Sequence, residues 1–177
     1  MSQDEIRSYV PNILCPDVLG AWHSRDIEIL VNPTGSFVRH SLFASSASML
    51  VFASSKNTIG GTKPENRNII AGLVLLRSSS NVVQGNYFGT RADGMGPLTS
   101  GAQPVGIQIE ASSSNLIGGT GPGARNVISA NGTGIHLGGL SFRFGELKGR
   151  ASGNRIFGNY IGVGADGLLP LPNVHSG

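Results

Sequence analysis

Residues 114–137 read SNLIGGTGPGARNVISANGTGIHL, and the first fifteen of them repeat an earlier stretch, KNTIGGTKPENRNII, at 56–70. Nine of these fifteen positions are identical, at an offset of 58 residues. A second match pairs NVVQGNYFGTRADG (81–94) with NRIFGNYIGVGADG (154–167), with eight of fourteen positions identical at an offset of 73. One insertion around 139–153 accounts for the difference of 15, so both matches belong to one duplicated unit.

A finer repeat lies inside this unit. MLVFASSKN (49–57), LVLLRSSSN (73–81) and IQIEASSSN (107–115) align without gaps, and IHLGG (135–139) begins a fourth copy. Each copy is apolar at its first and third positions, which predicts a short strand with these side chains on one face. A second strand is expected after each terminal asparagine, and a third strand after the next repeated asparagine.

The spacing between the second and third strands alternates between 11 and 5 residues, so one coil averages 29 residues. A coil this short cannot bury a core alone, but stacked coils can pair their equivalent strands in parallel about 4.8 Å apart. Asparagines in register at the bends would then hydrogen-bond along the stack and satisfy buried backbone groups. The alternative is an antiparallel sheet with Asn-Gly hairpin turns.

Composition limits the other possibilities. The 177 residues include 27 glycines, only 13% are charged, and the net charge is +3, which disfavours helical bundles and a phosphate-binding surface. Cys15 is the only cysteine, so no intrachain disulfide or structural zinc site is expected. No apolar run reaches the roughly 20 residues of a membrane span. The short basic cluster of Arg143, Lys148 and Arg150 predicts a solvated loop, and we expect no nucleic-acid partner.

The segments IGGTGPGARNVISANGTGIHL and GNYIGVGADG resemble repeats of the right-handed parallel β-helix proteins of the pectate-lyase-like group. More narrowly, they are similar to the NxIGGTxPGxRNVIS and GNYIGTxxxG repeats of large secreted bacterial proteins. The resemblance covers residues 48–172 and implies an all-β, right-handed parallel β-helix of about four to five three-strand coils. It also implies a secreted or cell-surface location, whereas activity differs among members, which include lyases, epimerases, adhesins and stalks.

This pattern divides the chain into two regions. Residues 1–47 are expected to form an N-terminal cap or a degraded coil, with a short helix at QDEIRSYVPNIL. Residues 48–177 form the repeat region, with the insertion at about 139–153. The final PNVHSG stands where the alternation predicts another strand, which suggests further coils of a longer parent chain.

The acids are too few and too scattered for the calcium clusters or paired carboxylates of carbohydrate-active enzymes. Glu110 is the only acid expected on a strand face of the repeat region, and no metal or cofactor is predicted. Its outward neighbours would be Gln108 and His136, with Arg77 one coil away. We expect a surface ion pair here, with Gln108, Glu110 and His136 as candidate ligand-binding residues. Alternatively, Glu110, His136 and Arg77 would serve acid–base catalysis.

Two further features point to contacts. The outward positions of the first coils are apolar, and such a patch predicts the N-terminal segment or a polysaccharide or protein partner over Leu50, Phe52, Val74 and Leu76. Tyr87 and Tyr160 recur at one position, which indicates a structural stack or a platform for sugar rings. The sequence therefore favours a non-catalytic structural or binding scaffold, with a polysaccharide lyase or epimerase as the alternative.

Overall fold

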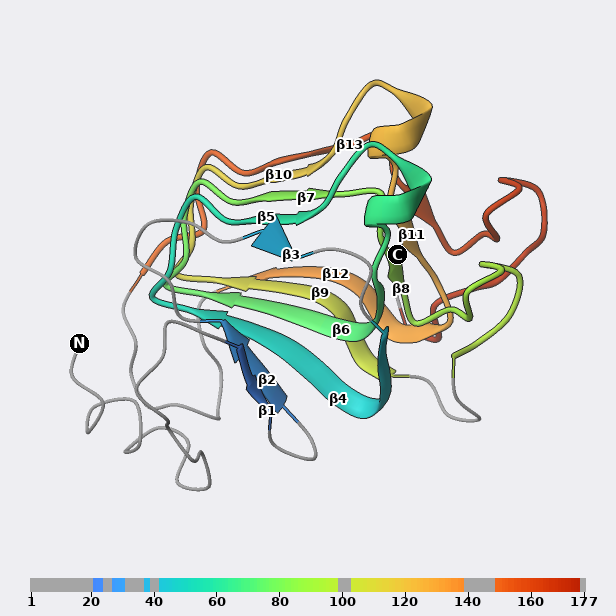
Figure 1. Ribbon diagram of the computed structural model, residues 1–177, viewed down its shortest axis with the longest axis horizontal. Helices are drawn as coiled ribbons and strands as arrows, with labels where there is room; N and C mark the ends of the chain where they lie inside the picture. Colours follow the sequence, from blue (N-terminus) through green and yellow to red (C-terminus); the bar gives the residue numbers. More distant parts are fainter. Residues whose placement is uncertain are drawn as a thin grey trace.

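The computed structural model describes residues 21–23, 27–30, 37–38, 42–98, 103–138 and 149–175, and side chains within 49–98, 105–138 and 149–175. Within these ranges the protein is all-β with mainly parallel sheets (Figure 1). The described helices are two short 3₁₀ turns, Pro64–Asn66 and Pro122–Ala124, which lie in the two long turns between second and third strands. The all-β prediction is confirmed.

The predicted first strands pair in parallel and form a first ladder. Its members, in order, are β2 (Ile27–Leu30), β4 (Leu42–Phe52), β6 (Ile69–Leu76), β9 (Gln103–Glu110) and β12 (Asn131–Gly138). The register places Met49 opposite Leu73, Leu73 opposite Ile107, and Ile107 opposite Ile135, as the gapless alignment predicts. Strand β1 (Ala21–His23) pairs antiparallel with β2 at the start of this ladder.

Two further ladders contain the predicted second and third strands. The second ladder runs through β3 (Phe37–Val38), β5 (Thr58–Gly60), β7 (Val82–Gln84), β10 (Leu116–Gly118) and β13 (Arg155–Phe157). The third joins the first residues of β4 and β6 to β8 (Tyr87–Phe88), β11 (Val127–Ile128) and β14 (Tyr160–Ile161). All these pairings are parallel, so the antiparallel hairpin alternative is wrong for the repeated strands.

The core lies between the three ladders and is built from their inward columns. Three successive positions in each column are fully buried: Val51, Leu75 and Ile109 in the first ladder, Ile59, Val83 and Ile117 in the second, and Ile70, Phe88 and Ile128 in the third. Burial of one such side chain stabilises the fold by about 1.5–3 kcal/mol relative to leaving it exposed. Each copy of the repeat therefore contributes a similar increment.

The predicted asparagine stacks are confirmed by hydrogen bonds between successive repeats. In the first stack, the Nδ2 groups of Asn57, Asn81 and Asn115 each donate to the Oδ1 of the next asparagine, at 2.8, 2.9 and 2.9 Å, and the stack ends at Asn154. Their backbone N–H groups donate to the same oxygens. A second stack has the same pattern and consists of Asn68, Asn86, Asn126 and Asn159.

Close approach of the backbone explains the glycines at the corners. Gly85 has a φ of +70°, and a Cβ there would lie 2.1 Å from the carbonyl oxygen of Gly61 in the preceding repeat. Gly158 repeats this arrangement, at 2.0 Å from the carbonyl oxygen of Gly119. No side chain fits at these contacts, so the glycines permit the spacing of the stack.

Two predictions for the non-repetitive parts cannot be compared with the structure. The helix expected at residues 3–14 lies outside the described residues, as does most of the predicted insertion. Residues 1–47 do contribute β1, β2, β3 and the start of β4 to the ladders. The domain boundary itself stays a prediction.

Candidate functional site

The outward face of the first ladder carries the predicted site residues. Gln108 on β9 lies opposite His136 on β12, and Glu110 lies opposite Gly138. On its other side, Glu110 lies opposite Leu76 of β6. The alternation of side chains along a strand places Gln108 and Glu110 on the same face, because they are two residues apart. The structure therefore brings Gln108, Glu110 and His136 onto neighbouring strands.

Glu110 is buried, with 2% of its surface exposed, which the sequence did not predict. The Nε2 of Gln108 donates a hydrogen bond to its Oε1, whereas Oε2 is buried without a hydrogen-bond partner. The preceding residues of this outward column, Phe52 and Leu76, are 4% and 2% exposed, so the whole column is covered at this point. The expectation of a surface ion pair on a solvated face is wrong for the described residues.

His136 is exposed and lies close to Gly138 of its own strand. A Cβ added to Gly138 would come within 2.6 Å of the His136 Nε2, so the glycine leaves room for the imidazole. Within the described ranges, neither a hydrogen bond nor an ion pair connects His136 with Glu110. The imidazole is therefore available at the surface, but it is not coupled to the buried carboxylate as an acid–base pair requires.

Arg77 directly follows the end of β6, where its φ is +49°. Its backbone N–H donates to the carbonyl oxygen of Glu110 at 3.1 Å, which joins the two residues through the main chain. The ion pairs of the described residues are Lys63 with Glu65 and Arg91 with Asp93, and Arg77 takes part in neither. The guanidinium is exposed and does not neutralise the Glu110 carboxylate.

The apolar side chains on the outward face of β4 and β6 are covered by other parts of the same chain. Leu50, Phe52 and Leu76 are 6%, 4% and 2% exposed, and Val74 is half-buried. The exposed apolar patch suggested by the sequence is therefore a covered surface. A polysaccharide or protein partner over these residues stays a prediction.

Sequence reasoning missed a repeated contact on the third ladder, which we call the arginine–tyrosine clasp. The guanidinium of Arg67 lies 4.2 Å from the ring centroid of Tyr87, and that of Arg125 lies 4.1 Å from the ring centroid of Tyr160. The Nε groups of the two arginines donate to the carbonyl oxygens of Gly85 and Gly158, respectively. This geometry supports a structural role for the tyrosines, because each ring already has a cation over one face.

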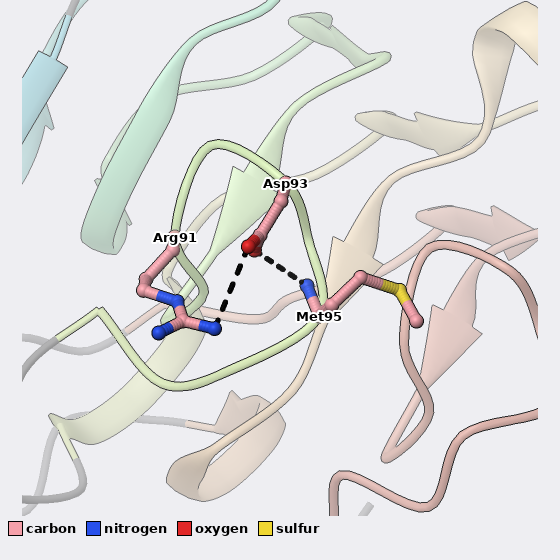
Figure 2. Close-up of polar contacts among 3 residues, drawn as sticks. All are labelled: Arg91, Asp93 and Met95. Atoms are coloured by element: carbon pink, nitrogen blue, oxygen red, sulfur yellow. Dashed lines mark hydrogen bonds and ion pairs between the residues drawn. The ribbon is translucent and has the colours of Figure 1, made fainter.

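The turns that follow these tyrosines are held by aspartates. Asp93 pairs with Arg91 at 3.4 Å and accepts a 2.9 Å hydrogen bond from the backbone N–H of Met95 (Figure 2). In the second copy, Asp166 accepts from the backbone N–H groups of Leu169 and Leu168. These two hydrogen bonds, that of Leu169 first, hold the pKa of Asp166 below its usual value. The aspartates of the repeated ADG motif thus have a role in the turn.

Other kinds of site find little support in the described parts of the chain. No group of three His, Cys, Asp or Glu side chains there is placed to hold a metal ion. Arg143 and Lys148 of the predicted basic cluster lie outside the described ranges, and Arg150 is exposed. The structure, as far as it is described, has no helix with the length and hydropathy of a membrane span.

The described geometry thus consists of one buried acid beside an amide, an exposed histidine and an exposed arginine. Comparison of the chain with protein-family models, with curated proteins and with solved structures finds no match.

Proposed function

We propose that the chain is a right-handed parallel β-helix that serves as a non-catalytic structural or binding scaffold in a secreted or cell-surface protein. The observation that carries this proposal is the pair of asparagine stacks, each of which crosses four successive coils. Buried amides that bond to their equivalents in the next coil, and in part to backbone carbonyl oxygens of the coil before, hold the coils in register and make the body rigid. Such a body suits a spacer or a platform for a ligand.

The candidate platform is the exposed edge of the outward face beside Gln108 and His136. Gln108 is half-buried and His136 is exposed, so both side chains can present hydrogen-bonding groups to a ligand hydroxyl. A carbohydrate is the ligand class that fits, because it is bound through many hydroxyl groups on shallow surfaces. The resemblance to secreted bacterial repeat proteins supports the same ligand class and location.

The alternative is a polysaccharide lyase or epimerase. The observation that favours it is the buried Glu110, whose Oε2 has no hydrogen-bond partner, because a desolvated carboxylate is a common component of acid–base sites. The separation of Glu110 from Arg77 and His136 described above counts against it.

A polysaccharide screen distinguishes the two functions. The purified protein is passed over immobilised acidic and neutral polysaccharides, and the soluble fraction is assayed for unsaturated and reducing ends. A scaffold is expected to be retained by at least one polysaccharide without releasing product, and His136→Ala should weaken that retention. Ser80→Ala, at an exposed turn position, is the matched control. Product release that disappears in Glu110→Gln would instead establish the enzyme.

A further inference from the structure

The inward residues of β12, β13 and β14 are more exposed than their equivalents in the preceding strands. Leu137 is 45% exposed, although Ile109, its partner on β9, is fully buried. Ile161 of β14 is 37% exposed, although its partner Ile128 is fully buried. Ile156 of β13 is also partly exposed in a column that is otherwise buried. We call the surface formed by β12, β13 and β14 the terminal face; β13 forms the upper edge of the second ladder in Figure 1.

The hydrogen bonds between the stacked asparagines run in one direction, toward the terminal face. The first three asparagines of each stack donate forward, from the backbone N–H and from Nδ2, to the Oδ1 of the following asparagine. The last members, Asn154 and Asn159, accept from Asn115 and Asn126. Among the described residues, their own backbone N–H groups have no acceptor. The terminal face therefore presents donors at the two positions where each earlier coil meets an asparagine oxygen.

The chain already begins to add a strand to this face. Asn173 accepts from the backbone N–H of Asn131 at 3.0 Å, so it lies one coil beyond Asn131. The backbone N–H groups of Val174 and His175 donate to the carbonyl oxygens of Asn131 and Gly132, at 2.8 and 2.7 Å. These contacts lead along β12 toward the exposed Leu137.

We infer that the terminal face is a docking surface for a coil of this same repeat pattern, in parallel orientation, with asparagine oxygens over Asn154 and Asn159. Its apolar inward residues would cover Leu137, Ile156 and Ile161. A second copy cannot use the same face through a two-fold axis, because donors would then oppose donors. Docking of the first coil of a second copy is also disfavoured, because β1 pairs antiparallel with β2 there. The inference rests on the proposed coil architecture and not on the ligand of the scaffold.

The test adds such a coil to the chain. Asn131 lies opposite Gln103 and Asn173 lies one coil beyond Asn131, so residue 175 is equivalent to residue 105. A copy of residues 106–130 that follows residue 175 therefore continues the chain in register. The matched control carries Asn115→Ala and Asn126→Ala in the copied segment only, so its apolar residues are unchanged. Backbone amide hydrogen exchange is measured at Asn154 and Asn159 in the original chain and in both extended chains.

Exchange at Asn154 and Asn159 should be about tenfold slower or more in the extended chain than in its control. Equal exchange rates at Asn154 and Asn159 in the two extended chains would overturn the inference. Loss of slow exchange at Asn81 in the extended chain would also overturn it, because the added coil would then disrupt the coils on which it is meant to stack. Fast exchange at Asn81 and Asn115 in the original chain would instead overturn the coil architecture itself. Dimers of the original chain in sedimentation, with Asn154 and Asn159 protected, would show that a second copy occupies the face.

Discussion

Gly85 shows how little space separates successive repeats at the turn before β8. Alanine at this position would combine a left-handed backbone with a Cβ 2.1 Å from a carbonyl oxygen. We expect Gly85→Ala to lower the free energy of unfolding by at least about 2 kcal/mol, measured by urea unfolding. The control is Gly121→Ala, because Gly121 has a φ of −78° and open space around its Cα. A loss no larger than that of the control would contradict the close approach.

Glu110 carries a polar atom that is buried without a partner. Glutamine has the same shape but no charge, so Glu110→Gln should raise the free energy of unfolding by about 1 kcal/mol at neutral pH, because it removes an unsatisfied carboxylate from a covered position. Chemical unfolding of the variant and the original chain gives the difference. Gln108→Leu is the companion variant, since it removes the amide that bonds to Oε1 and should destabilise. Lower stability of Glu110→Gln would show that the carboxylate is favourable where it lies.

The turn at residues 164–169 depends on an ionised aspartate. The pKa of Asp166 is lowered in the folded protein, so the carboxylate form stabilises this turn above the unfolded pKa of about 4, and this contribution is lost as the pH falls through the lower folded pKa. We therefore expect faster amide exchange at Leu168 and Leu169, relative to the intrinsic rate, as the pH falls below about 4. In Asp166→Asn this pH dependence should disappear. If the acceleration persists in that variant, another group is responsible.

The arginine–tyrosine clasp joins a long turn to the third strand of the next repeat. Arg125→Ala should lower the free energy of unfolding by about 1–2 kcal/mol, because it removes the cation over Tyr160 and the hydrogen bond to Gly158. Arg125→Lys keeps the charge but not the planar group, and should recover less than half of the loss. Arg155→Ala serves as the control, since its guanidinium lies farther from a ring, at 5.3 Å from the Phe157 centroid. Equal losses at Arg125 and Arg155 would argue against the clasp.

At the scale of the whole molecule, a defect in one asparagine stack should spread to both neighbouring coils. Asn115→Ala leaves the buried backbone N–H and Nδ2 of Asn81 without their acceptor and removes the side-chain donor to Asn154. We expect a loss of about 2–4 kcal/mol and faster amide exchange at Val82 and Arg155. Ser114→Ala, at an exposed neighbouring position, is the control. An unchanged melting curve for Asn115→Ala would refute the structural role of the stack.

The register and the asparagine stacks could be predicted from the sequence because both depend on local repetition. Leu73 and Ile107 occupy equivalent positions in aligned segments, and stacking in parallel follows from that equivalence. The burial of Glu110 could not be predicted, since alternation places a side chain on a face but does not say what covers that face. The clasp was missed because Arg67 and Tyr87 belong to different repeats, although the recurrence of both residues at Arg125 and Tyr160 was a usable signal.

The one-way bonding of the asparagines gives the molecule an electrical direction. In each stack the side-chain oxygens accept from the preceding asparagine, and one Nδ2 hydrogen of each of the first three members donates to the following asparagine, so these contributions to the amide dipoles point in one direction. Neighbouring dipoles in such a chain polarise one another within the low-dielectric interior. The stacks end at Asn154 and Asn159 on backbone N–H groups that have no acceptor among the described residues, and these groups place partial positive charge at that end of the stacks, independently of the ionisable residues on the surface.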